Sequence, residues 1–526
     1  MLCDLGFLEC NGPVGYHMHQ VIADYGRDHL ETESRITASA RLIAYVLELL
    51  ETFADDYVRL DEEMPTLLAA LETVSARNVR HELIQIIGAA TPFLMLRGQP
   101  ALAERYLQQA CHLTKQARDD TPLPKLFWLL GNVFLMLDRL HEAAAAYQEG
   151  IQVARALQDE ENLCKLLADL GWQMHLFGLA DQADTYMREG MGLASRLGLR
   201  EQLVVLYKIQ GSVAWMQGNY AHAEEAYQQG LRLLEQLDPC RRKDLGSYYC
   251  FLGWMAGVQG KYEQAEEFFQ RSIEATDHYT PDVSAFVWGM RCTIQVLSRP
   301  ETTIRENLER VLQRAQECGV GYCMYVYKAL ALLELALGNT ERAEQEAQRG
   351  LAIAQRVQAK HQPGELMTVL ATIALQRGDV EQAASLLEQA FPLVRATSSA
   401  EERATTIATW GEVLLRRRHF EEAEVVFQEA LQIAPREHKP LAALAQYGLA
   451  RAAAGRGDVS KALRQGEQAL QMFTSLRHTR TLEVQRWFHA LQEHLDQRKA
   501  QGIAVTMTSL PLEPKRSLSP EESRFS

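Results

Sequence analysis

The residues best suited to metal or nucleophilic chemistry are the nine cysteines and fifteen histidines, and their spacing predicts neither kind of site. Cys318 and Cys323 come nearest to a metal-binding pair, but no second Cys or His pair at zinc-like spacing follows them. His489 and His494 are five residues apart and therefore fall on different faces of a helix. The sequence also lacks the HExxH and GxSxG motifs of hydrolases. We predict that the chain is not an enzyme and holds no metal or cofactor.

Composition argues against two classes of partner. The chain has 68 acidic and 54 basic residues, and its net charge of -14 opposes an autonomous grip on a phosphate backbone. No stretch reaches the roughly 18 to 20 uncharged apolar residues of a membrane helix. The first residues lack the basic region and apolar core of a secretory signal. We expect a cytoplasmic protein with reduced cysteines that binds neither nucleic acid nor membrane.

One short phrase recurs along the chain and predicts a helix end, a turn and a helix start. A glycine after a helix allows the left-handed residue that closes its last turn. The clearest copies are GNYAHAEEAYQQGL at Gly218, GKYEQAEEFFQRSI at Gly260, GNTERAEQEAQRGL at Gly338 and GDVEQAASLLEQAF at Gly378. A period of about 40 residues extends this phase to ten turn positions: Gly98, Asp138, Gly178, Gly218, Gly260, Arg299, Gly338, Gly378, Arg418 and Gly457.

Two further sets of positions, each at a fixed offset from the ten turns, test this repeat phase, because they were not used to set it. We call each set a column. Five residues after the turn, nine of the ten positions hold alanine, and the exception is Ile304. Seven residues before the turn every residue is small, which lets paired helices approach at the short end of the ~8 to 10 Å range. This small column is Thr91, Gly131, Gly171, Gly211, Gly253, Cys292, Ala331, Ala371, Gly411 and Ala450. The sixth unit, around Pro300, lacks both the turn glycine and the alanine, so we expect an irregularity there.

A bulky residue usually follows four positions after the alanine, and a small one three positions later. The order small, alanine, bulky, small resembles the tetratricopeptide repeat, lengthened here from 34 to about 40 residues. The resemblance implies an all-α, right-handed superhelical solenoid. We expect ten such repeats over residues 79–480, a capping helix with a polar outer face over 481–500, and a disordered tail over 501–526.

The N-terminal residues do not fit the repeat. They predict strands at 7–10 and 15–18, then a helix from His19. The run YHMHQVIADYGRDHL resembles the segment that closes the winged helix of STAND-class signalling ATPases, the NB-ARC and MalT-like regulators. This resemblance implies a partial winged-helix remnant at 1–30 and bridging helices at 31–78. Without a GxxxxGK(S/T) loop, ATPase activity cannot be carried over. His19, at the family's nucleotide-facing position, is expected to be structural.

In such solenoids the first helix of each hairpin lines the concave groove. Positions three before, one after and four after the small column share one helical face. Four of the seven tryptophans fall there in units two to five, and two lysines nearby could meet a carboxylate or phosphate. The alternative is that the indoles fill the seam between successive first helices. The candidate groove is Trp128, Asn132, Lys165, Trp172, His175, Lys208, Ser212, Trp215 and Trp254.

Two functions remain open. In the first, the chain is a non-catalytic sensor or scaffold module of a bacterial-type signalling or transcription regulator that binds a protein, a peptide or a small inducer in its groove. In the second, it is the C-terminal part of a STAND-class ATPase transcriptional regulator, and Met1 is an internal start downstream of a nucleotide-binding domain. The sequence identifies neither the ligand nor the oligomeric state.

Overall fold

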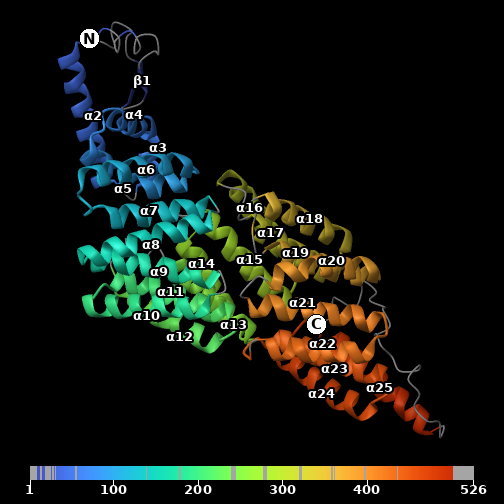
Figure 1. Ribbon diagram of the computed structural model, residues 1–526. Coiled ribbons are helices and arrows are strands. Elements are labelled where there is room, and N and C mark those ends of the chain that lie inside the picture. Colours follow the sequence, from blue (N-terminus) through green and yellow to red (C-terminus); the bar gives the residue numbers. More distant parts are fainter. Residues whose placement is uncertain are drawn as a thin grey trace. The chain divides into compact units, whose positions relative to one another are not determined.

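The computed structural model describes residues 9–11, 15–17, 25, 29, 31–53, 56–137, 139–176, 179–237, 245–276, 281–318, 323–356, 359, 362–395, 399–434 and 436–500. These residues hold 24 helices and one pair of short strands (Figure 1). The chain divides into two compact units, Met1–Leu166 (unit 1) and Leu167–Ser526 (unit 2), and each is described by itself. The predicted all-α fold of paired helices is confirmed.

Unit 1 begins with an antiparallel strand pair, β1 (Glu9–Asn11) and β2 (Gly15–His17). Three helices follow: α2 (Thr32–Thr52), α3 (Tyr57–Glu62) and α4 (Met64–Ala76). They lie where the sequence predicts strands and bridging helices. The winged-helix assignment stays a prediction, because most of residues 1–30, His19 among them, lie outside the described residues. The predicted tail at 501–526 lies outside them as well.

Ten helix hairpins follow, and the boundary between the units falls inside the first helix of the third. In unit 1 the hairpins are α5–α6 (Arg80–Leu96, Pro100–Ala117) and α7–α8 (Leu123–Met136, Leu140–Leu157). The third to sixth are α9–α10 (Glu160–Leu176, Ala180–Leu197), α11–α12 (Arg200–Met216, Tyr220–Glu235), α13–α14 (Leu245–Val258, Tyr262–Thr276) and α15–α16 (Pro281–Ser298, Thr302–Cys318). The seventh to tenth are α17–α18 (Cys323–Ala336, Thr340–Arg356), α19–α20 (Gln362–Arg377, Val380–Arg395), α21–α22 (Ala400–Arg416, Phe420–Ile433) and α23–α24 (Lys439–Gly455, Val459–Ser475).

Among the described residues, the predicted turns are left-handed where the sequence places a glycine, at Gly98, Gly218, Gly260, Gly338, Gly378 and Gly457. The predicted turns at Asp138 and Gly178 lie outside the described residues. At Gly218, φ is 83°, its N–H donates to Trp215 O at 2.9 Å, and the next N–H donates to Ala214 O at 2.9 Å. These two bonds form a Schellman motif, which satisfies carbonyls at the end of a helix. Arg418 adopts the same conformation, with φ 62°, although it is not glycine. The N–H of Arg299 instead donates to Gln295 O, four residues back. The sixth hairpin therefore departs from the others, as its sequence predicts.

The residues of the small column pack against the bulky residues that follow four positions after the alanine in the same hairpin. We call these bulky residues the bulky column. A Cβ added at Gly131 would lie 2.3 Å from the ring of Tyr147, and one at Gly211 would lie 2.6 Å from the ring of Tyr227. Both rings are fully buried. A larger residue in the column would therefore push the two helices apart. These contacts explain why both columns recur with the repeat.

The last hairpin is covered by α25 (Thr481–Ala500), which lies where the sequence predicts a capping helix. Its Val484, Trp487 and Leu491 are fully buried and belong to one apolar cluster with Tyr447 and Phe473 of the tenth hairpin. Covering the apolar face of a terminal hairpin is what keeps an open-ended repeat array soluble.

Candidate functional site

In unit 1 the predicted groove residues are Trp128, Asn132 and Lys165. Trp128 is half-buried on α7, and Lys165 Nζ lies 5.9 Å from the centroid of its ring. The same ammonium forms an ion pair with Glu161 Oε1 at 2.8 Å. Asn132 Oδ1 accepts a hydrogen bond from Tyr147 Oη at 2.6 Å. The tryptophan and the lysine lie together, whereas the asparagine is used inside its own hairpin; their role as groove residues stays a prediction.

In unit 2 several predicted groove residues are buried. His175 is 2% exposed, and its ring centroid lies 5.9 Å from that of half-buried Trp172. Ser212 is 9% exposed; its Oγ donates to Lys208 O at 3.0 Å and lies 3.1 Å from Tyr227 Oη. These side chains contribute more to packing than to an open surface. The groove assignment stays a prediction for them.

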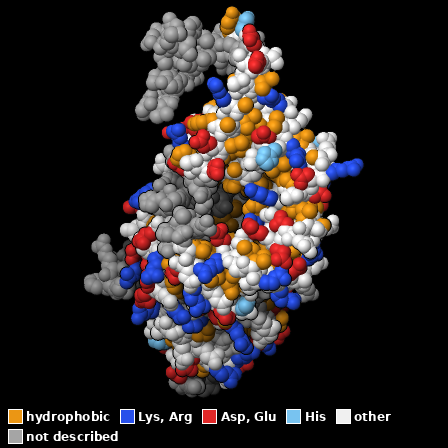
Figure 2. Space-filling view, turned by 90° about the vertical axis from the view of Figure 1, so that its left-hand side faces the viewer, with side chains coloured by type: hydrophobic (Ala, Val, Ile, Leu, Met, Phe, Trp, Pro, Cys, Tyr) orange, Lys and Arg blue, Asp and Glu red, His pale blue; other side chains and the backbone are white. Residues whose placement is uncertain are grey.

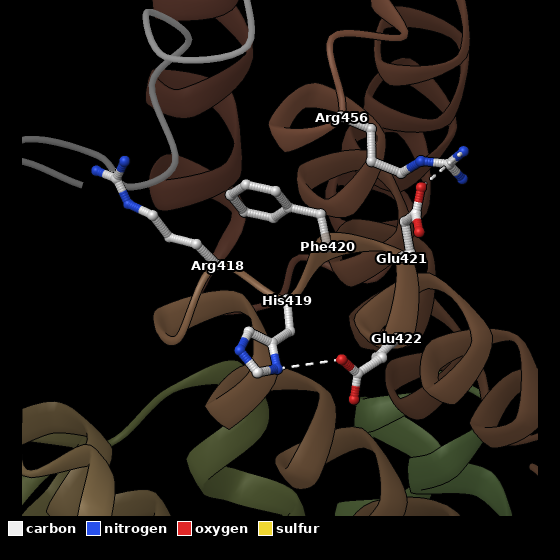
Figure 3. Close-up of a pocket in the computed structure, with 6 residues that line it drawn as sticks. All are labelled: Arg418, His419, Phe420, Glu421, Glu422 and Arg456. Carbon is white, nitrogen blue, oxygen red and sulfur yellow. Dashed lines mark ion pairs between the residues drawn. The ribbon is translucent and has the colours of Figure 1, made fainter.

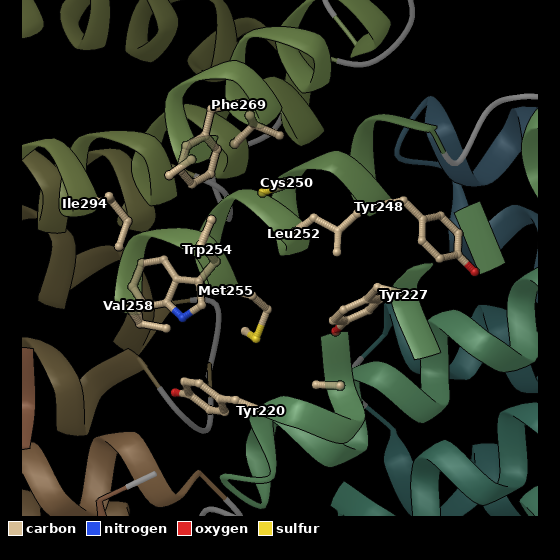
Figure 4. Close-up of a cluster of buried hydrophobic side chains, with 14 of the residues drawn as sticks. Tyr220, Tyr227, Tyr248, Cys250, Leu252, Trp254, Met255, Val258, Phe269 and Ile294 are labelled. Atoms are coloured by element: carbon tan, nitrogen blue, oxygen red, sulfur yellow. The ribbon is translucent and has the colours of Figure 1, made fainter. Parts of the chain in front are cut away.

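Trp215 and Trp254 lie together at the junction of the fourth and fifth hairpins, with ring centroids 6.4 Å apart in an edge-to-face arrangement. Trp254 is 5% exposed and belongs to the apolar cluster drawn in Figure 4, so it fills the seam between first helices. Its indole nitrogen points toward the side of the cluster where Tyr220 lies. Trp215 is half-buried and keeps part of its ring accessible.

Trp215 is also the first member of a row of aromatic rings that crosses four successive first helices. The row consists of Trp215 on α11, Phe251 on α13, Phe286 on α15 and Tyr325 on α17, and all four side chains are half-buried. Consecutive ring centroids are 5.7, 6.2 and 5.1 Å apart. Gln362 Nε2 on α19 donates to Tyr325 Oη at 2.8 Å. We call these four residues the aromatic row.

The repeat register identifies only one of the four residues of the aromatic row. Trp215 stands four residues after the small position of its helix, but Phe251 stands two before, and Phe286 and Tyr325 stand six before. The row therefore crosses the helices obliquely, and no fixed register selects it. The available signal was the presence of aromatic residues in each of four successive first helices.

A half-buried ion pair adjoins the end of the row. Lys328 lies one helical turn after Tyr325, and its Nζ is 2.6 Å from Glu365 Oε2. Burial alone would lower the pKa of Lys328, but the carboxylates of Glu365, Glu402 and Glu401 raise it above its ordinary value. The ammonium thus stays charged. Lys328 stands three before its small position, so extending the predicted groove to unit seven would have found it.

A second polar cluster joins parts of unit 2 that are far apart in the sequence. Tyr220 Oη donates to Glu401 Oε2 at 2.6 Å, across 181 residues, and His438 Nε2 lies 3.4 Å from Glu401 Oε1. His438 Nδ1 accepts the N–H of Leu441 at 3.2 Å and so caps α23. That bond leaves the ring proton on Nε2, where it can be donated to Glu401. We call Tyr220, Glu401 and His438 the closing triad.

The protonation states of the triad follow from its surroundings. Burial alone would raise the pKa of Glu401, but His438, Tyr220 and Lys328 lower it below its ordinary value. Burial and the charge of Glu401 raise the pKa of Tyr220 well above its ordinary value, against the opposing effect of Trp215 and Trp254. At neutral pH the triad therefore holds a carboxylate that accepts from a neutral tyrosine.

A depression of about 310 Å³ lies at the turn of the ninth hairpin (Figure 3). Its charged groups are paired with one another: His419 Nδ1 lies 3.1 Å from Glu422 Oε1, and Arg456 Nη2 lies 3.8 Å from Glu421 Oε1. Its remaining lining residues are Arg418 and Phe420. Because four of its polar groups pair with one another, this open surface is a weaker candidate for ligand binding than the aromatic row.

In the described part of the chain, no helix is long and apolar enough to cross a membrane. No three His, Cys, Asp or Glu side chains are grouped there as a metal ion would require. On the face drawn in Figure 2, basic and acidic side chains intermingle, and neither sign of charge forms a continuous field.

Comparison with known proteins agrees with this fold. The tetratricopeptide repeat family model matches residues 201–277 and 402–475, which are the fourth, fifth, ninth and tenth hairpins. No curated protein matches the chain at the sequence level. A Rap protein complexed with competence and sporulation factor superposes with a TM-score of 0.52 at 12% identity, covering 67% of this chain and 98% of the Rap chain.

Two other solved structures are similar to a lesser degree. A STAND signal-transduction ATPase with a tetratricopeptide repeat sensor from Pyrococcus horikoshii has a TM-score of 0.46 at 14% identity; the match covers 75% of this chain and 57% of that one. The Rap conjugation regulator of plasmid pLS20, in complex with the Phr* peptide, has a TM-score of 0.45 at 13% identity, covering 60% and 96%. Together with the ten hairpins, the family-model matches and the first structural match make this chain a tetratricopeptide-type helical repeat protein.

Proposed function

We propose that the chain is a non-catalytic binding module that takes an extended peptide, or an extended segment of a protein, along the aromatic row. The row is the observation that carries this proposal. Its rings are 5.1 to 6.2 Å apart, close to the ~6.6 Å between side chains on one face of an extended peptide. Half-exposed aromatic rings supply contact area at a low entropic cost.

Polar groups flank the row and suit the backbone and charged ends of a peptide. Lys328 and Glu365 lie at one end, and the closing triad lies beside Trp215 at the other. The Rap protein of the same fold, complexed with competence and sporulation factor, supports a ligand-binding role. Unpaired cysteines such as Cys250 and Cys292 support the cytoplasmic location that belongs to this proposal.

The direct test selects a peptide and then removes one ring of the row. Peptides would be selected from a displayed library on the full chain, and the strongest would be titrated calorimetrically. Phe251→Ala should weaken its binding at least tenfold. Tyr249→Ala is the matched control, because this half-buried ring on the same helix stacks on Phe268 and lies outside the row. Equal affinity for both variants, or no selected peptide, would exclude the proposal.

A second candidate is a sensor arm of a STAND-class ATPase regulator. The strand pair at Glu9–Asn11 and Gly15–His17, followed by α2 to α4, has the order of elements that this resemblance implies. In that case binding on the row would be relayed to a nucleotide-binding domain encoded upstream. Reading the gene upstream of Met1 in frame for a GxxxxGK(S/T) loop tests this candidate. A stop codon immediately before Met1 would count against it.

A further inference from the structure

Unit 2 is closed on itself by contacts between hairpins that are distant in the sequence. The N–H of Thr479 donates to Leu297 O at 2.9 Å, which joins the start of the cap to the sixth hairpin. Leu476 packs so closely on Gly260 that an added Cβ would lie 2.4 Å from it. In Figure 1 the green fourth and fifth hairpins meet the orange ninth and tenth hairpins. These contacts join the fifth and sixth hairpins to the end of the tenth hairpin and the start of the cap.

The closing triad is the buried polar part of this closure. Tyr220 is fully buried and His438 is 8% exposed, whereas the nearby Arg477–Glu263 ion pair is more than 80% exposed on both sides. Solvent weakens an exposed pair of this kind, so it contributes little to closure. The hydrogen bond from Tyr220 to Glu401 is partly buried, since the Glu401 side chain is 21% exposed. It contributes more than the exposed pair, because breaking it leaves the charge without its donor.

The triad lies against the aromatic row at one end and acts electrostatically at the other. Tyr220 belongs to the same apolar cluster as Trp254, and Trp215, the first ring of the row, packs against that cluster. The carboxylate of Glu401 also acts on Lys328, one turn beyond Tyr325, the last ring of the row. A change in the triad therefore alters the surroundings of both ends of the row.

We propose that the closing triad is a latch that holds unit 2 closed around the aromatic row, and that a ligand enters and leaves the row when the latch opens. This inference rests on the proposed function, since it regulates the same site. Closure would slow both association and dissociation of the ligand. Weakening the latch should therefore change the rates more than the affinity.

The first experiment measures closure without any ligand. Tyr220→Phe keeps the buried ring and removes the hydroxyl that donates to Glu401. Hydrogen exchange of the Thr479 amide, which bonds across the closure, should become about tenfold faster. Glu401→Gln, which keeps the shape and removes the charge, should do the same. The control is Tyr249→Phe, which removes a hydroxyl that donates to Glu235 of the neighbouring fourth hairpin, at 3.3 Å.

The second experiment uses the peptide selected on the full chain and follows it by stopped-flow fluorescence. Tyr220→Phe should speed association and dissociation severalfold each, and Tyr249→Phe should change neither rate. Unchanged exchange at Thr479 in both triad variants would overturn the latch. Faster exchange with unchanged peptide rates would overturn its control of the row. Failure of the proposed function is distinguished from both, because it would appear as unchanged peptide affinity in Phe251→Ala.

Discussion

The two units are built from the same hairpin but differ in how far their polar contacts reach along the chain. In unit 1 the ion pairs between hairpins join neighbours: Arg139 pairs with Glu104, and Lys115 pairs with Glu149 across 34 residues. In unit 2 Tyr220 reaches Glu401 across 181 residues. The repeat pattern is therefore enough to specify neighbour contacts, whereas a closed unit also needs contacts that the pattern does not contain.

The units also differ in where their charge-stabilised carboxylates lie. In unit 1, hydrogen bonds from Arg80 and Arg139 lower the pKa values of Asp119 and Glu142, whose side chains are 45% and 53% exposed. In unit 2, burial opposes the shift, yet basic partners still lower the pKa of three less exposed carboxylates. They are Glu401 beside His438, Glu424 beside Lys461 and Arg456, and Glu483 beside Arg480. Charges that are partly withdrawn from solvent in this way depend on their partners more than exposed charges do.

The largest expected effect on stability comes from truncating a buried core tyrosine in either unit. Tyr147→Ala in unit 1 and Tyr227→Ala in unit 2 each empty the space opposite a glycine of the small column. Each should lower the free energy of unfolding by about 3 to 5 kcal/mol. Hydrogen exchange followed by mass spectrometry should locate the lost protection in the unit that carries the substitution. Equal loss in both units would show that they do not unfold separately.

The next largest difference between the units should be the loss of stability at acid pH. A carboxylate whose pKa is lowered in the folded state stabilises that state above its ordinary pKa, and this contribution is lost as the pH falls through the lowered value. Unit 2 should therefore lose stability below about pH 4.5, by up to about 1.4 kcal/mol per pH unit for each such carboxylate. Unit 1 should change less, because its two carboxylates are exposed. Urea unfolding between pH 5 and 3 measures this, and equal acid sensitivity would contradict it.

Binding should depend on the row more than on the groove predicted from the sequence. Trp215→Ala should weaken the selected peptide 10- to 100-fold, about 1.4 to 2.8 kcal/mol. Trp128→Ala in unit 1 should change the affinity less than about threefold, and Trp172→Ala should behave likewise. Calorimetric titration compares the three variants. If the last two weaken binding as much as Trp215→Ala, the wider groove is the binding surface.

The smallest expected effects concern the ion pairs between neighbouring hairpins, which both units share. Arg139→Ala in unit 1 removes a partner of Glu104, and Arg377→Ala in unit 2 removes a partner of Glu344. Each should lower the free energy of unfolding by less than about 1 kcal/mol, because the arginines are about one-third exposed. Urea unfolding at low and high salt checks this. A loss above about 2 kcal/mol that persists at high salt would contradict it.

Sequence reasoning could predict the hairpins because each is specified locally. A turn residue, a small residue and a bulky residue at fixed separations determine one hairpin, and the phase predicted a turn at Arg418, whose backbone is left-handed. It also identified the sixth hairpin as irregular, and Arg299 lacks the left-handed turn bonds. These features depend on residues within about one repeat of each other.

The candidate site could be predicted only in part because it depends on how successive hairpins are placed. A single register found Trp215 but missed Phe251 and Phe286, since the row crosses the helices obliquely. The bond between Tyr220 and Glu401 has no local signature at all. Burial was equally invisible: His175 occupies a predicted groove position and is 2% exposed.

The span of the closing triad restricts how this protein can evolve. Repeat arrays commonly gain and lose hairpins by duplication or deletion of one unit. The fifth to eighth hairpins lie between Tyr220 and Glu401, and one more copy of about 40 residues would carry the carboxylate away from the hydroxyl. Selection for the triad would therefore fix the number of hairpins within this span, and natural length variants should gain or lose repeats outside it.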